Sequence, residues 1–107
     1  MTIKTYIHTI GKQLRDSEDK AERRSLRAKL TYAMAYRKGT LDEYRNRAIE
    51  REMGKIYSRS ATDNIGGENS AENKAYQAFR AKCEARVDQE MASLKAEIER
   101  TIEQPSA

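Results

Sequence analysis

SAENKAYQAFRAKCEARVDQEMASLKAEIERTIEQ, residues 70–104, contains neither glycine nor proline and is followed by Pro105. Its large apolar residues recur at steps of three or four, which is the spacing of one helix face. They are Tyr76, Phe79, Cys83, Val87, Met91, Leu94, Ile98 and Ile102. A helix of this length would extend on the order of 50 Å, whereas a domain of this size has a radius of gyration of about 13 Å. The stretch therefore predicts a long amphipathic C-terminal helix.

Steps of four outnumber steps of three along this apolar stripe. A coiled coil alternates the two steps, and extra steps of four locally unwind its supercoil. We therefore expect a fairly straight helix with one of two uses. It is either the spine on which the rest of the chain packs, or the seam of a homodimer at its C-terminal end.

The N-terminal segment, residues 3–15, also has helical spacing of its aliphatic residues. They are Ile3, Ile7, Ile10 and Leu14. A short strand is the alternative, because isoleucine and threonine favour strands. Helix is the better prediction, since no obvious strand partner is found elsewhere in the sequence.

Two more helices follow in the first half of the chain. One is expected to begin in the acidic segment 16–19 and to end near Lys38, because Gly39 is a natural left-handed terminal residue. The other begins after Thr40, which suits a helix N-cap, and is expected to run to about residue 58. The very short connection between them requires a hairpin or a corner.

Residues 60–69 are rich in glycine, asparagine and serine, which is the composition of a linker. The chain is thus expected to be a single helical domain, residues 1–107, with a basic helical part (1–59), this linker, and the long amphipathic helix (70–104). The predicted fold class is all-α: a small helical bundle of three to four helices with one long C-terminal helix.

The charge is unevenly distributed along the chain, of which 36% is charged residues. Residues 1–59 carry 15 Lys and Arg against 8 Asp and Glu, a net charge of +7. Residues 60–107 carry 6 against 9, a net charge of −3. The basic half would attract phosphates or the acidic surface of a protein, whereas the acidic half would not favour a nucleic acid.

Several function classes lack their sequence signals. With one histidine, His8, and one cysteine, Cys83, the chain can form neither a His/Cys metal cluster nor an internal disulfide. No phosphate loop or nucleophile motif is present, and no apolar run approaches the roughly 20 residues of a membrane span. We therefore expect no enzyme, no metal, no cofactor and no membrane partner, and a cytoplasmic location.

The most unusual local feature is a row of cations, Arg47, Arg51, Lys55 and Arg59, at successive spacings of four. Like charges at this spacing repel each other on a helix. Either local ion pairs relieve this repulsion, or the row binds a partner. Glu43 and Glu50 are spaced to pair with Arg47, and Glu52 with Lys55. The candidate partner-binding residues are Arg37, Lys38, Arg45, Arg47, Arg51, Lys55 and Arg59.

Four tyrosines are interleaved with these cations: Tyr32, Tyr36, Tyr44 and Tyr57. Their rings could stack on bases, but at helical spacing they more often pack against the core with a solvated hydroxyl.

These features predict a non-enzymatic interaction protein. It would be a small basic helical adaptor or inhibitor of a larger, nucleic-acid-handling partner, of a kind common among phage and mobile-element products. Its partner would be a protein with an acidic surface. The alternative is direct nucleic-acid binding, in which the same cations contact phosphates.

Overall fold

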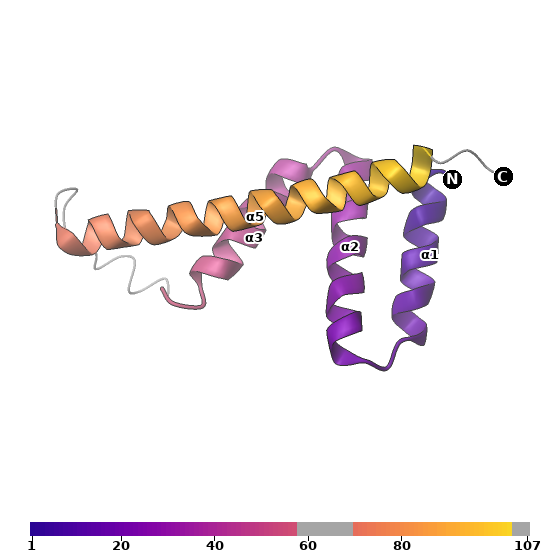
Figure 1. Ribbon diagram of the computed structural model, residues 1–107, viewed down its shortest axis with the longest axis horizontal. Coiled ribbons are helices and arrows are strands. Elements are labelled where there is room, and N and C mark those ends of the chain that lie inside the picture. Colours follow the sequence, from indigo (N-terminus) through magenta and orange to yellow (C-terminus); the bar gives the residue numbers. More distant parts are fainter. Residues whose placement is uncertain (58–69, 104–107) are drawn as a thin grey trace. The chain divides into compact units, whose positions relative to one another are not determined.

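The computed structural model describes residues 1–57 and 70–103, and the secondary structure of this part is helical throughout. The helices are α1 (Ile3–Asp16), α2 (Lys20–Lys38), α3 (Leu41–Met53) and α5 (Ala71–Glu103) (Figure 1). The predicted all-α fold with a long C-terminal helix is confirmed, and the strand alternative for residues 3–15 is wrong. The predicted linker, residues 60–69, lies outside the described residues.

The chain divides into two units. Unit 1 comprises Met1–Tyr44 and Met91–Ala107, and unit 2 comprises Arg45–Glu90. Both α3 and α5 contribute residues to both units. The single-domain prediction stays a prediction.

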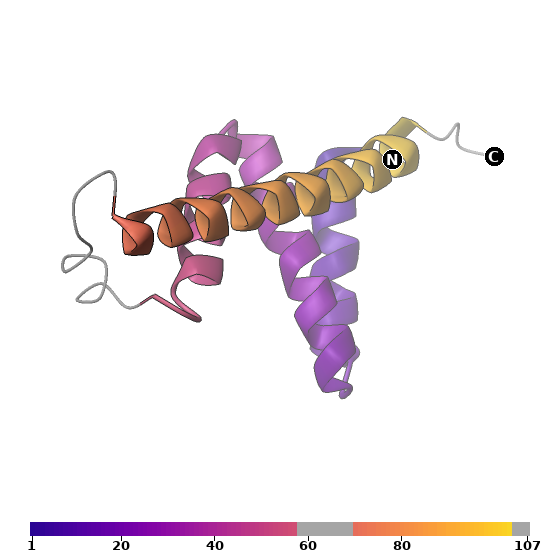
Figure 2. The ribbon, with the colours of Figure 1, turned by 60° about the vertical axis from the view of Figure 1, so that its left-hand side comes forward.

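In unit 1, α1 and α2 form an antiparallel hairpin and lie side by side (Figures 1 and 2). The Thr2 hydroxyl caps α1 by accepting a hydrogen bond from the Thr5 N–H at 3.2 Å. Of the acidic segment predicted to start α2, Asp19 is the residue that caps it, accepting from the Ala21 N–H at 3.1 Å. Both helix starts thus follow from short polar side chains placed one residue before the helix.

The connection within the hairpin is tied by Arg23. Its guanidinium donates to the carbonyl oxygens of Leu14 at 2.6 Å and Ser17 at 2.9 Å. These carbonyls lie where α1 ends and have no partner within the helix. The positive charge of Arg23 at this position also interacts favourably with the negative end of the α1 dipole.

The end of α2 is as the sequence predicts. Gly39 has φ 75°, in the left-handed region. The Thr40 N–H donates to the Ala35 carbonyl at 2.9 Å and the Gly39 N–H to the Tyr36 carbonyl at 3.4 Å. This pair of bonds is the Schellman arrangement, and it turns the chain directly into α3.

The end of α3 differs from the prediction, because the helix stops at Met53 instead of continuing to about residue 58. Gly54 follows it, and glycine costs about 1 kcal/mol relative to alanine inside a helix. The Lys55 and Ile56 N–H groups then donate to carbonyls three residues back, at 3.4 and 3.1 Å, which is a tight turn. Lys55 therefore does not continue a helical row of cations.

A closed apolar cluster forms the core of unit 1. Its buried members come from α1, α2 and the last turns of α5: Tyr6, Ile10, Leu26, Tyr32, Ala33, Leu94 and Ile98. Tyr32 is 1% exposed and packs edge-to-face on Tyr44, with ring centroids 5.4 Å apart. An ion pair between Lys29 and Glu97, at 3.1 Å, joins α2 to α5 at the rim.

The apolar stripe predicted for the C-terminal helix is thus used within the chain. Its members Cys83, Val87, Leu94 and Ile98 are buried, and the other four are half-buried. This supports the interpretation of the helix as a spine. The homodimer seam gains no support from the structure.

Candidate functional site

Unit 2 contains most of the cations predicted to bind a partner. The part of α3 from Arg45 onward packs on the first half of α5, and each helix places two buried apolar residues one turn apart. They are Ile49 and Met53 on α3, and Cys83 and Val87 on α5. This spacing of four is about one helical turn, so Ile49 and Met53 lie on the same face of α3.

Aromatic rings close one end of unit 2. Tyr57, which follows the turn after α3, packs edge-to-face on Tyr76 of α5 with ring centroids 5.2 Å apart. It also contacts Phe79 at 5.6 Å. The Ser70 hydroxyl caps α5 near this end, accepting from the Asn73 N–H at 3.0 Å.

Ion pairs connect α3 to α5 along their length. Arg45 donates to both carboxylate oxygens of Asp88, at 2.7 and 3.2 Å, and lies 4.0 Å from Glu84. Arg86 of α5 donates to Glu52 of α3 at 3.2 Å. The forked contact to Asp88 has the geometry that arginine favours with a carboxylate.

Two pairs between residues close in the sequence extend this network. Lys55 donates to Glu52 at 3.0 Å, and Arg80 donates to Glu84 at 3.0 Å. Glu52 and Glu84 each therefore lie between two cations.

The ion pairs shift the pKa values of their members. The hydrogen bond from Arg45 lowers the pKa of Asp88. The hydrogen bond from Lys55, assisted by the Arg86 charge, lowers the pKa of Glu52. The contact with Glu84, followed by one with Tyr76, raises the pKa of Arg80. Each shift favours the charged form of the group, as expected for opposite charges in contact.

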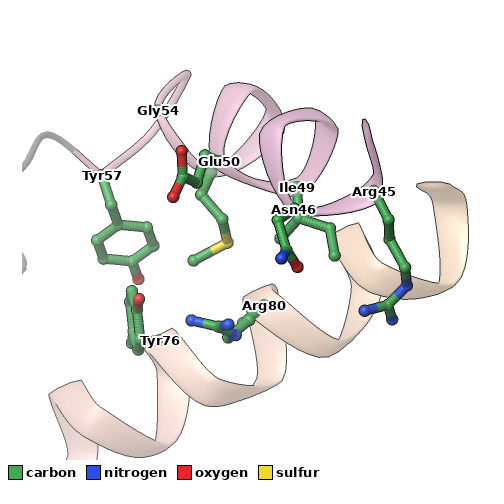
Figure 3. Close-up of a pocket in the computed structure, with 9 residues that line it drawn as sticks. Arg45, Asn46, Ile49, Glu50, Gly54, Tyr57, Tyr76 and Arg80 are labelled. Carbon is green, nitrogen blue, oxygen red and sulfur yellow. The ribbon is translucent and has the colours of Figure 1, made fainter. Parts of the chain in front are cut away.

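A groove of about 650 Å³ lies between α3 and α5 (Figure 3). Tyr57 and Tyr76 stand at one end, Arg45 at the other, and Arg80 on the α5 side. The lining residues are Arg45, Asn46, Ile49, Glu50, Met53, Gly54, Tyr57, Tyr76 and Arg80. Sequence reasoning missed the roles of Asn46, Tyr76 and Arg80 here, because nothing local to α3 indicates which turn of α5 it faces.

Six of the seven predicted site residues are among the described residues, and they fall into three groups. Arg37 and Lys38 are exposed in the last turn of α2, in unit 1. Arg45 and Lys55 are paired with carboxylates of unit 2. Arg47 and Arg51 are exposed, one turn apart on α3. Arg59 lies outside the described residues.

The local ion pairs predicted for α3 form only in part. Glu52 pairs with Lys55 as expected. Within residues 1–57 and 70–103, however, neither Arg47 nor Arg51 takes part in an ion pair, although Glu43 and Glu50 have suitable spacing. These two arginines are therefore solvated cations on the outer side of α3.

The tyrosines interleaved with the cations are packing residues. Tyr32 is buried, and Tyr36, Tyr44 and Tyr57 are half-buried with their rings against other rings. Burial and a nearby tyrosine also raise the pKa of the Tyr32 hydroxyl. The packing interpretation of these residues is supported.

His8 is exposed on α1, and Cys83 is buried on α5. Among the described residues, no group of three or more His, Cys, Asp or Glu is arranged to hold a metal ion. Nor does any helix in this part of the chain have the length and apolar character needed to cross a membrane.

Comparison of the chain with protein-family models, with curated proteins and with solved structures gives no match.

Proposed function

We propose that this chain is a non-enzymatic interaction protein that binds an acidic face of a protein partner through α3. The observation that carries the proposal is the pair Arg47 and Arg51, two exposed guanidinium groups one turn apart without an ion partner among the described residues. Their charges repel each other at this spacing, so carboxylates of a partner would relieve that repulsion. Arginine also suits forked contacts to carboxylates.

Arg37 and Lys38 are a second proposed contact set, in unit 1. They are exposed in the last turn of α2. Their positive charges also interact favourably with the negative end of the α2 dipole, so a structural role accounts for part of their presence.

A protein partner is favoured over a nucleic acid by the tyrosines. Sequence-tolerant binding of single strands relies on exposed aromatic rings that stack on bases. Here the rings of Tyr32, Tyr36 and Tyr44 pack on one another, which leaves phosphate contacts alone for direct binding. In its fuller form, the proposal is an adaptor or inhibitor of a nucleic-acid-handling machine. It would be encoded by a phage or mobile element and act in the cytosol.

The test is affinity capture with three baits, the wild type, R47A/R51A and K12A/R15A, followed by quantitative mass spectrometry. K12A/R15A removes the same charge from exposed positions on α1 and is the matched control. We expect an acidic protein that the wild type and the control retain and that R47A/R51A loses. Equal retention by all three baits, with native helicity, would show that the site is elsewhere.

A titration into labelled duplex and single-stranded DNA and RNA across a salt series tests the alternative. Micromolar binding with a steep salt slope, weakened in R47A/R51A, would replace the proposal by direct nucleic-acid binding. Absence of binding at low salt would remove that alternative.

A further inference from the structure

The contact between α3 and α5 in unit 2 has a small apolar core. Its buried apolar residues are Ile49, Met53, Cys83 and Val87, against seven in the cluster of unit 1. The groove beside Ile49 and Met53 further limits the packing on this face of α3. Apolar burial alone therefore holds α3 to α5 weakly.

Ion pairs flank this small core on both sides. On α5, Glu84 directly follows Cys83, and Asp88 directly follows Val87. Both carboxylates lie on the side that Arg45 reaches. Arg86 reaches Glu52 on the other side. The side chains of Arg45, Asp88 and Arg86 are 36%, 53% and 70% exposed, so dissolved salt screens these pairs.

We propose that Arg45–Met53 of α3, together with the turn at residues 54–57, forms an ionic latch on α5 that opens locally while unit 1 stays folded. Opening uncovers the apolar face around Cys83 and Val87. Local openings of this kind cost less free energy than global unfolding where buried contacts are few and the connecting bonds are exposed.

Cys83 reports on the latch, because it is the single cysteine of the chain and is 3% exposed. The experiment is alkylation of the wild-type protein by iodoacetamide, a neutral reagent, at constant pH and from roughly 20 mM to roughly 1 M NaCl. The same reaction in urea at each salt concentration gives the intrinsic alkylation rate of the Cys83 thiol, and the rate in the folded protein is divided by it. We expect the calibrated rate to rise about tenfold, the effect of screening a few exposed pairs. A rate that does not change with salt would overturn the proposal.

Hydrogen exchange under the same conditions separates local opening from global unfolding. Peptides covering residues 45–57 should exchange faster at high salt, whereas peptides from α1 and α2 should keep their protection. If both sets of peptides change together, the opening is global and the latch is disproved.

A charge exchange tests the ion pairs themselves. R45D and D88R should each raise the alkylation rate severalfold at low salt, and the double variant R45D/D88R should restore much of the slow rate. The matched control is K95E, which reverses a charge that pairs with Glu99 in unit 1 and should leave the rate unchanged. Equal rates in R45D and the wild type, or an equal rise in K95E, would contradict the proposal.

Discussion

The two units stabilise the same helix, α5, in different ways. In unit 1, Leu94 and Ile98 of α5 join a closed cluster with residues from α1 and α2. In unit 2, Cys83 and Val87 are covered by a short stretch of α3 and flanked by exposed ion pairs. A continuous apolar stripe therefore need not have uniform stability. Its stability depends on how much apolar surface the facing elements bring to each part.

The largest expected effect is that of Y32A in unit 1. Removing a large ring that is 1% exposed should lower the free energy of unfolding by about 3–5 kcal/mol, the usual range for aromatic-to-alanine changes in a core. Urea denaturation followed by circular dichroism measures it. Y32F keeps the ring contacts with Tyr36 and Tyr44 and should lose much less. A loss below 1 kcal/mol in Y32A would mean that the cluster does not hold unit 1 together.

I49A should have a smaller effect, confined to unit 2. We expect a loss of about 2 kcal/mol, the lower end of the range for aliphatic-to-alanine changes, because the groove beside Ile49 already limits its packing. Hydrogen exchange of residues 45–57 should accelerate while that of α1 is unchanged. If α1 exchange accelerates equally, the distinction between the units fails.

R23A should weaken the hairpin of unit 1 by about 1.5 kcal/mol, because the carbonyls of Leu14 and Ser17 lose a charged donor. The midpoint of thermal unfolding measures the loss. R23K is the control for charge alone: lysine keeps a cation near the helix end but replaces the guanidinium nitrogen that donates both bonds. Identical midpoints for R23A and the wild type would show that solvent replaces the guanidinium without cost.

Acid should produce the smallest effect and should act on unit 2 first. The pKa values of Asp88 and Glu52 are lowered in the folded protein. The two carboxylates therefore contribute their full stabilisation at a pH above the ordinary pKa values of the unfolded chain. This stabilisation is lost as the pH falls through the lowered pKa values of the folded protein. Methyl NMR signals of Ile49 and Val87 should shift below about pH 4, before those of Ile10 and Ile98. D88N should reduce this dependence. Simultaneous shifts in all four residues would remove the predicted order.

Much of the fold could be predicted because its signals are local. The spacing of apolar residues gave α5 and its buried stripe, and Gly39 marked the end of α2 by the left-handed conformation that it adopts. Gly54 is a comparable signal, and the predicted extension of α3 to about residue 58 is wrong because the helix stops before this glycine. In the structure Ile56 is 66% exposed.

The candidate site was less predictable, because its contacts join distant parts of the chain. Arg45 and Asp88 are 43 residues apart, and Glu52 and Arg86 are 34 apart. A helical wheel places Arg45 beside the inward face of α3 but carries no information about which carboxylate it meets. The sequence could therefore identify a surplus of cations on α3 but not which of them are neutralised within the chain.

The tie made by Arg23 has a consequence for the order of folding. It joins residues only six and nine positions apart, so the hairpin of α1 and α2 closes a short loop and needs little of the chain to form. Contacts of this kind form fast, whereas pairing α3 with α5 must wait for a partner far along the sequence. During synthesis the hairpin emerges before α3 and α5, and we expect it to be a preformed surface onto which α5 condenses.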